Sequence, residues 1–251
     1  MIYDPYFYLC AIPAVLIFAL GKGGFGGALG IVSVPLMSLV ISPPQAAAIL
    51  LPILCVMDLL VLHKFWGRWH RENLRIMLPA ALLGVVIGGL SFHYLTEAHV
   101  RILIGLLALG FAMNHWVKGK DRPKTQPSWL KGSFWSALAG FTSFGIHSGG
   151  PPISVYLLPQ KLHPTVFLGT TGVFFALVNY VKLIPYAMLG QLSVGNLWTS
   201  LVLLPLAPIG VSLGYYLHKK VSITQFYSLF YLFLVLTGSK LLYDGVNGLI
   251  G

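Results

Sequence analysis

Long apolar stretches alternate with short polar segments along the whole chain. The longest stretches each contain about 18 residues or more, which is enough for a helix to cross the hydrocarbon core of a bilayer. They lie at 44–63, 74–92, 100–117, 165–187, 197–217 and 222–243. This pattern predicts an all-α polytopic membrane protein, inserted in the cell (inner) membrane as a multi-pass protein.

The remaining apolar stretches are shorter and come in pairs joined by glycine-rich segments. Residues 7–41 are interrupted by GKGGFGG at 21–27, and residues 133–160 are interrupted by GIHSGGPP at 145–152. We expect each pair to form a broken or re-entrant helical hairpin. Backbone breaks at membrane depth are tolerated only where they are buried in protein or line a watered cavity, so these segments also predict a cavity.

The distribution of Lys and Arg predicts the orientation. The loops at 64–75 and 118–131 are strongly basic, so both should be cytoplasmic. Lys161 and the pair Lys219 and Lys220 join that side only if the hairpin 133–160 enters and leaves by the same face. Under this topology the basic linker at 121–131 is cytoplasmic and both termini are external.

The same topology divides the chain into two halves of opposite orientation. The first repeat, 1–120, and the second repeat, 132–251, each contain one glycine-broken hairpin followed by three spans. Residues 30–35 (GIVSVP) resemble 150–155 (GPPISV), and a Leu-Pro pair with two later glycines recurs from residue 78 and from residue 204. Inverted-topology repeats with broken helices are typical of secondary transporters, which bind substrate near the midplane.

Composition agrees with this interpretation. The chain has 251 residues, of which 57% are hydrophobic and 9% are charged, against roughly a quarter charged in soluble domains. A net charge of +10 would suggest nucleic acid as a partner of a soluble protein, but here the charges lie between apolar stretches and report orientation. We therefore expect the lipid bilayer, and no nucleic acid, as a partner. The first residues lack the basic region and cleavage site of a secretory signal, so the first apolar stretch should belong to the fold.

The polar side chains near the two breaks are donors rather than acids. Lys22 lies in the first break, and the second contains or adjoins Thr142, Ser143, His147 and Ser148. A helix that begins after a break offers free N–H groups and a partial positive charge, which favours an anion. We predict a small anionic substrate.

Glycines can also serve only to let helices pack closely in a membrane. We assign this role to Gly84 with Gly88 and to Gly210 with Gly214. These pairs could seal the two repeats against each other or join two protomers, so a homodimer is compatible with the sequence.

Three further polar residues lie within predicted spans. Asp58 could carry a coupling proton or balance Lys22, although it could equally be an interfacial residue near the end of its span. Asn179 is its approximate counterpart in the second repeat. Lys182 lies toward the external end of its span, where we expect its side chain to snorkel to the head groups.

Other kinds of chemistry find little support in the sequence. Cys10 and Cys55 form no ligand motif, and no histidine pair has the spacing of a helical metal site, so we expect neither metal nor cofactor. The glycine pattern at 21–26 fits G-x-G-x-x-G but lacks the strand and βαβ context of a dinucleotide site. His147 and Ser148 are adjacent and would point apart on one turn, which argues against a hydrolase.

Two glycine motifs carry a family resemblance that covers nearly the whole chain. They are Gly21-x-Gly23-Gly24-x-Gly26-Gly27 followed by Val34-Pro35, and Gly145-x-x-Ser148-Gly149-Gly150-Pro151-Pro152. With them, the chain resembles the TauE/SafE family of sulfite exporters, also called the TSUP family of membrane permeases. The resemblance implies a transporter for sulfur-containing or related organic anions, such as sulfite and sulfonates. It would place Gly24, Gly26, Gly149, Gly150 and Pro151 beside the substrate.

The expected mechanism is alternating access, with one half rocking against the other around the anion. An inside-negative membrane potential drives anions outward, so export needs no coupling ion, whereas uptake would need a proton or sodium ion, coupled through Asp58. A passive anion channel is the main alternative. An intramembrane enzyme or a structural membrane subunit is a weaker one.

Overall fold

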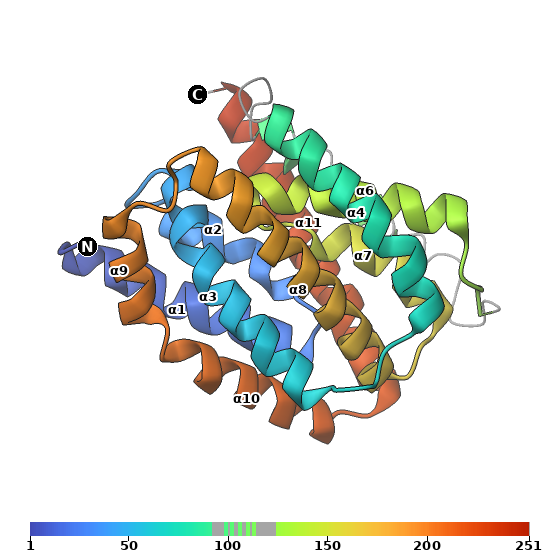
Figure 1. Cartoon of the computed structure of the whole chain (residues 1–251). Coiled ribbons are helices and arrows are strands. Elements are labelled where there is room, and N and C mark those ends of the chain that lie inside the picture. Colours follow the sequence, from blue (N-terminus) through green and yellow to red (C-terminus); the bar gives the residue numbers. More distant parts are fainter. Residues whose placement is uncertain are drawn as a thin grey trace.

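The computed structural model describes residues 1–91, 98–99, 101–102, 105–106, 109–110, 112–113 and 124–250, and every regular element within them is a helix. Figure 1 shows the arrangement. The elements are α1 (Pro5–Gly24), η1 (Ala28–Val32), α2 (Ser33–Met37), α3 (Pro43–Lys64), α4 (Arg71–Ser91), α6 (Trp129–Ile146), α7 (Gly150–Leu157), η2 (Leu158–Gln160), α8 (Pro164–Met188), α9 (Val194–Leu203), α10 (Leu206–Lys220) and α11 (Ile223–Ile250). The predicted span at 100–117 and residues 121–123 of the predicted linker lie wholly or largely outside the described residues.

Several helices are long and apolar enough to cross a membrane. Within the described residues these are α1, α3, α4 and α8, and the pair α9 and α10 would add a fifth span if it counts as one. The helices α3, α4 and α8 begin and end close to the apolar stretches 44–63, 74–92 and 165–187. The prediction of a helical, polytopic membrane protein is therefore confirmed.

The predicted span at 197–217 is not one straight helix. It is divided into α9 and α10, which meet at an angle of 45° around Pro205. Pro205 and Pro208 lack the N–H groups that would bond the carbonyls of Leu201 and Leu204 in a continuous helix. Each of those carbonyls instead accepts a hydrogen bond from the residue three positions later. The N–H of Leu204 donates to Leu201 (3.3 Å), and the N–H of Ala207 donates to Leu204 (3.0 Å).

The chain turns back within each glycine-rich segment, and in the first segment it does so later than the sequence pattern suggested. The helix α1 continues through Gly24, and α6 continues through Ile146. The first turn then uses positive φ angles at Gly26 (57°) and Gly27 (81°), and the second uses one at His147 (53°). Each long helix is followed by a short return segment, η1 with α2 in one case and α7 with η2 in the other.

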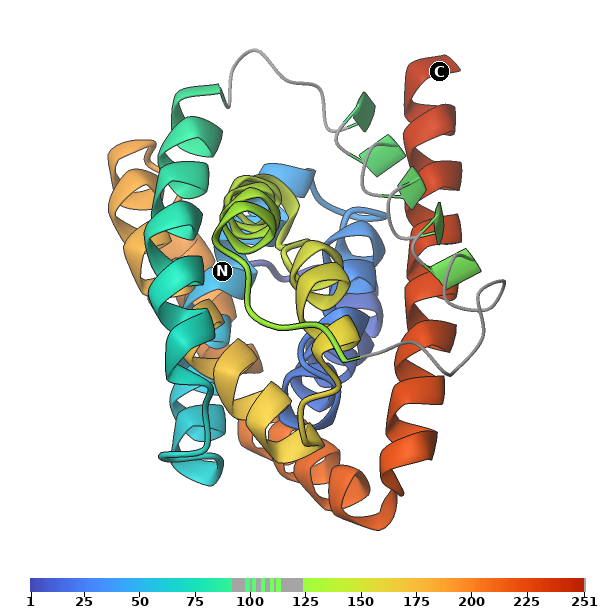
Figure 2. The same cartoon turned by 90° about the vertical axis from the view of Figure 1, so that its right-hand side faces the viewer.

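Glycines bring the long helices into close contact with helices far away in sequence. The helix α1 packs along α10, where a Cβ added at Gly23 would lie 2.2 Å from the Val211 carbonyl oxygen. The helix α6 packs along α4, where a Cβ at Gly84 would lie 2.0 Å from the Ala137 carbonyl oxygen. Gly210 and Gly214 face α1, and Gly84 and Gly88 face α6, so their predicted packing role is confirmed. In Figure 2, α4 and α11 stand at opposite sides, with α6 and α7 between them.

Polar contacts hold together each end of the bundle. At the end where the chain begins, Gln45 Nε2 of α3 donates to Asn196 Oδ1 of α9 (3.3 Å). At the opposite end, Asn73 Nδ2 of α4 donates to Gln160 Oε1 of η2 (2.7 Å), and the Tyr156 hydroxyl of α7 donates to Asn73 Oδ1 (2.8 Å). The helices α3 and α8 pack against each other and reach from one end to the other.

The contact between α4 and α6 leads to a prediction. Gly84→Ala should lower the free energy of unfolding by about 1–3 kcal/mol, because its methyl group would overpack a rigid backbone contact. The measurement is the thermal unfolding midpoint of the purified protein in detergent.

Gly89→Ala, in the same helix, is the matched control. Its Cβ would lie 3.6 Å from the Phe144 ring, which is ordinary van der Waals contact, so the midpoint should stay unchanged or rise. Equal losses in both variants would contradict the packing argument.

Candidate functional site

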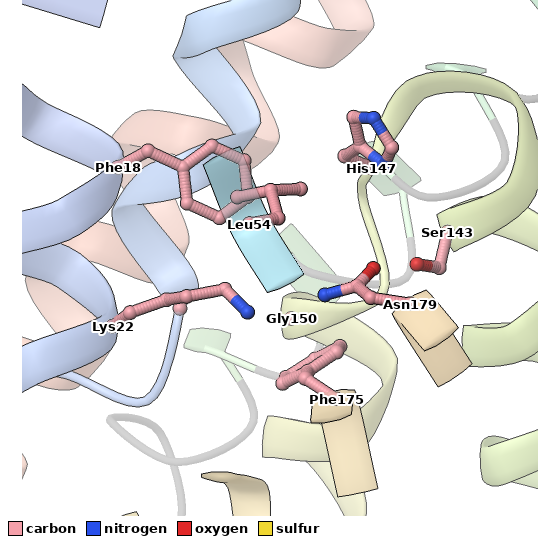
Figure 3. Close-up of a pocket in the computed structure, with 9 residues that line it drawn as sticks. Phe18, Lys22, Leu54, Ser143, His147, Gly150, Phe175 and Asn179 are labelled. Atoms are coloured by element: carbon pink, nitrogen blue, oxygen red, sulfur yellow. The ribbon is translucent and has the colours of Figure 1, made fainter. Parts of the chain in front are cut away.

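The two turns meet at a pocket in the middle of the bundle. The pocket lies at the level of Leu54, halfway along α3. Gly27 reaches it from the first turn and Gly150 from the second. Its other lining residues are Phe18, Lys22, Ser143, His147, Phe175 and Asn179. Figure 3 shows Lys22 entering from one side, with Asn179, Ser143 and His147 on the other.

Lys22 belongs to a buried three-residue network. Its Nζ forms an ion pair with Asp58 Oδ1, and Asn179 Nδ2 donates to Asp58 Oδ2 at 2.6 Å. Asp58 is 1% exposed, so the interfacial interpretation of this residue is wrong. The alternative, that Asp58 balances Lys22, is confirmed by the ion pair. The carboxylate has both oxygens bonded, as a buried charge requires.

Lys182 forms a second buried network. Its Nζ donates to the Ser143 carbonyl oxygen (2.8 Å), to Ser143 Oγ (3.0 Å) and to His147 Nδ1 (2.8 Å). The side chain is 0% exposed, so the expectation that it snorkels to the head groups is wrong. The polar acceptors at the end of α6 bind the ammonium group inside the protein, and it therefore has no need to reach the interface.

His147 has both ring nitrogens engaged. Its Nε2 lies 2.9 Å from the Ala47 carbonyl oxygen, which can only accept, so Nε2 carries the proton. Nδ1 is then the acceptor for Lys182, and the ring is neutral. In this conformation His147 lines the pocket with its carbon edge and offers no free N–H group.

The remaining polar residues of the second break shape the turn itself. The Thr142 hydroxyl donates to the carbonyls of Ala139 (3.3 Å) and Ser148 (3.1 Å), which closes the loop. Ser148 Oγ is buried and has no hydrogen-bond partner within the described residues. Because Pro151 and Pro152 lack N–H groups, the first turn of α7 can offer N–H donors only from Gly149 and Gly150.

Not all the predicted substrate residues meet at the pocket. A Cβ at Gly24 would lie 2.4 Å from the Gly214 carbonyl oxygen, and one at Gly26 would lie 2.6 Å from Phe167, so these glycines face neighbouring helices. Gly149 packs against the Ala139 carbonyl and Phe175. Lys22, Ser143, His147, Gly150 and Asn179 do line the pocket, whereas Thr142, Ser148 and Pro151 lie in the adjoining turn. Substrate contact by any of them stays a prediction.

The sequence contained a signal for the residues that were missed. Phe175, Asn179 and Lys182 are spaced at i, i+4 and i+7, which places them on one face of α8. The repeat makes Asn179 the counterpart of Asp58, so the face of α8 that contains Asn179 should be buried. Lys182 could therefore have been expected inside.

Metal ligands are not gathered at this site: within the described part of the chain no group of three His, Cys, Asp or Glu residues could hold an ion.

Comparison with known proteins gives one match. The family model described as Sulfite exporter TauE/SafE matches residues 11–241, which is nearly the whole chain. No curated protein and no solved structure matches significantly.

The buried ion pair leads to a prediction. Lys22→Met and Asp58→Asn should each destabilise the fold by about 3–5 kcal/mol, because each leaves one buried charge unpaired. The double variant removes both charges, so it should be more stable than either single variant. The measurement is chemical or thermal unfolding of all three variants in detergent.

Lys240→Met is the control for loss of a lysine. Lys240 pairs with Asp244 at 2.5 Å but its side chain is 46% exposed, so its removal should cost no more than about 1 kcal/mol. A double variant that is less stable than both single variants would contradict the prediction, because it would show that an unpaired buried charge is not the cause of the destabilisation.

Proposed function

This chain belongs to the sulfite exporter TauE/SafE family, and we propose that it is a secondary transporter that moves a small sulfur-containing or organic anion across the cell membrane. The observation that carries the proposal is the central pocket, where the two glycine turns meet and Lys22, Ser143 and Asn179 supply donors. These groups suit a small oxyanion, because ammonium, hydroxyl and amide groups all donate hydrogen bonds. The family is one of transporters, and none of the proposed roles involves catalysis.

We propose that the two halves are inverted repeats. The support is an exchange of packing partners: α1 of the first half packs on α10 of the second, and α6 of the second half packs on α4 of the first. In addition, the suggested counterparts Asp58 and Asn179 contact each other. Residues on a two-fold axis contact their own equivalents, so this contact fits an axis between α3 and α8.

Alternating access then follows from opening one end of the bundle at a time. The Gln45–Asn196 contact holds one end, and the Asn73–Gln160 contact holds the other. Each contact joins residues from different halves. Separation of the halves at one end, while the contact at the other end persists, would expose the pocket to one side only.

The membrane potential supports export, and the distribution of basic residues supplies the orientation. If the basic loops are cytoplasmic, the end containing Asn73 faces the cytoplasm and both termini are external. One negative charge that moves outward across an inside-negative membrane gains about 2.3 kcal/mol per 100 mV. Export of an anion therefore requires no coupling ion, whereas uptake would require a proton or sodium ion.

Filling the pocket should abolish transport. Gly150→Leu places a branched side chain at a lining position, so uptake of sulfite or methanesulfonate into proteoliposomes should fall below about a tenth of the wild-type rate, the equivalent of losing about 1.4 kcal/mol. The wild-type rate should saturate with concentration and rise when the same anion is preloaded on the opposite side.

Gly145→Leu is the matched control from the same glycine-rich segment. A Cβ at Gly145 meets nothing within 4 Å, and the residue does not line this pocket, so transport should persist. Normal transport by correctly folded Gly150→Leu would remove this pocket from the mechanism. Flux that never saturates and shows no counterflow would indicate a channel.

A further inference from the structure

The buried charges around the pocket do not sum to zero. Among the described residues, the buried side chains with a formal charge are Lys22, Asp58 and Lys182. Lys22 and Asp58 neutralise each other as an ion pair. Lys182 contacts only neutral groups, which are two oxygens of Ser143 and the neutral ring of His147. In its ammonium form, Lys182 therefore adds one positive charge that has no acidic partner in the described part of the bundle.

The surroundings of Lys182 can satisfy its ammonium form. Its Nζ lies within hydrogen-bond distance of three acceptors, and the ammonium form carries three N–H bonds. Since His147 Nε2 carries the ring proton, Nδ1 has only a lone pair to offer. These hydrogen bonds satisfy the donors but supply no negative charge, and an uncompensated charge away from water is costly.

Ser143 connects this charge with the pocket. When Lys182 is an ammonium ion, Ser143 Oγ accepts its hydrogen bond, so the hydroxyl hydrogen must point elsewhere. No acceptor for that hydrogen is found among the described protein groups, and Ser143 lines the pocket, with its oxygen directed inward in Figure 3. Lys182 thus makes Ser143 a donor toward the pocket and also increases the positive potential there.

We propose that Lys182 sets the charge of the transported anion: the substrate supplies the missing counter-charge and carries one negative charge. This inference rests on the proposed transport function and narrows its substrate class to monoanions, such as sulfonates, hydrogensulfite or carboxylates. A dianion would leave an excess negative charge beside Asp58 inside the protein. Lys182 is a positioning residue, because it acts through Ser143.

The first test compares anions of different charge on wild-type protein in proteoliposomes. Methanesulfonate, a monoanion, should compete for transport at least about tenfold better than sulfate, a dianion. The reason is that the interaction energy of two unit charges inside a protein exceeds the free energy that corresponds to a tenfold change in affinity. The apparent KM for total sulfite should fall as the pH is lowered and hydrogensulfite increases. The KM for methanesulfonate, which stays a monoanion, should change less than the KM for total sulfite over the same range.

The outcomes separate the two proposals. Transport of sulfate at least as well as methanesulfonate would overturn the monoanion inference and leave the transporter proposal in place. A KM for total sulfite that rises as the pH is lowered would likewise overturn the monoanion inference and leave the transporter proposal in place. If no anion is transported or bound, the transporter proposal fails, and the inference fails with it.

The second test asks whether Lys182 supplies the charge. Methanesulfonamide resembles methanesulfonate in shape but is neutral, so the ratio of their inhibition constants reports recognition of charge. Lys182→Met should reduce the wild-type preference for methanesulfonate at least about tenfold. Lys182→Arg should retain much of the preference, and Lys240→Met, at an exposed ion pair, should retain all of it.

A purely structural lysine would give a different result, because its loss would weaken both compounds equally, and this result would overturn the inference. If Lys182→Met does not fold, Ser143→Ala provides the test, since it removes the donor that Lys182 orients and leaves the lysine in place. It should weaken methanesulfonate binding about tenfold, as expected for a lost hydrogen bond to a charged group. Unchanged binding by this variant would also overturn the inference.

Discussion

The fold depends on one constraint: a chain that turns back within a membrane must enclose its turn in protein. Two turns in the described part of the chain, at Phe25–Gly27 and at His147–Gly149, lie in the middle of the bundle, where N–H and C=O groups cannot be left facing lipid. Glycine contacts let α1 approach α10 and α6 approach α4 at backbone distance. The helices α3 and α8 pack between the hairpins, so both turns come to lie against one central pocket.

The same enclosure determines how the polar groups are used. Away from water, each charge must find its partner among a few neighbours. Asp58 therefore engages Lys22 and Asn179, while Lys182 engages Ser143 and His147. His147 has no nitrogen left for an anion in this conformation, so donors toward the pocket come from Lys22, Ser143 and Asn179. The positive charge that Lys182 adds in its ammonium form connects the architecture with the chemistry of the proposed substrate.

Local rules explain where sequence analysis failed. The span at 197–217 was expected to be continuous, although Pro205 and Pro208 remove two helical bonds and bend it. The glycine run at 21–27 was expected to break the first helix at its start, but Gly21 to Gly24 remain helical because close packing against α10 stabilises them there. Lys182 was assigned to the interface because a charge in a span usually seeks water, and no sequence pattern revealed its acceptors on α6.

The sequence by itself determined the membrane class, most helix bounds, the two glycine-rich turns and the family to which the chain belongs. These features depend on hydropathy, helix length and backbone freedom, which are local properties. Only the tertiary structure decided that Gly27 and Gly150 share one pocket while Gly24 and Gly26 face other helices, and that Lys182 points inward. Such choices depend on which helices meet, because the partner of a buried polar group can come from any part of the chain.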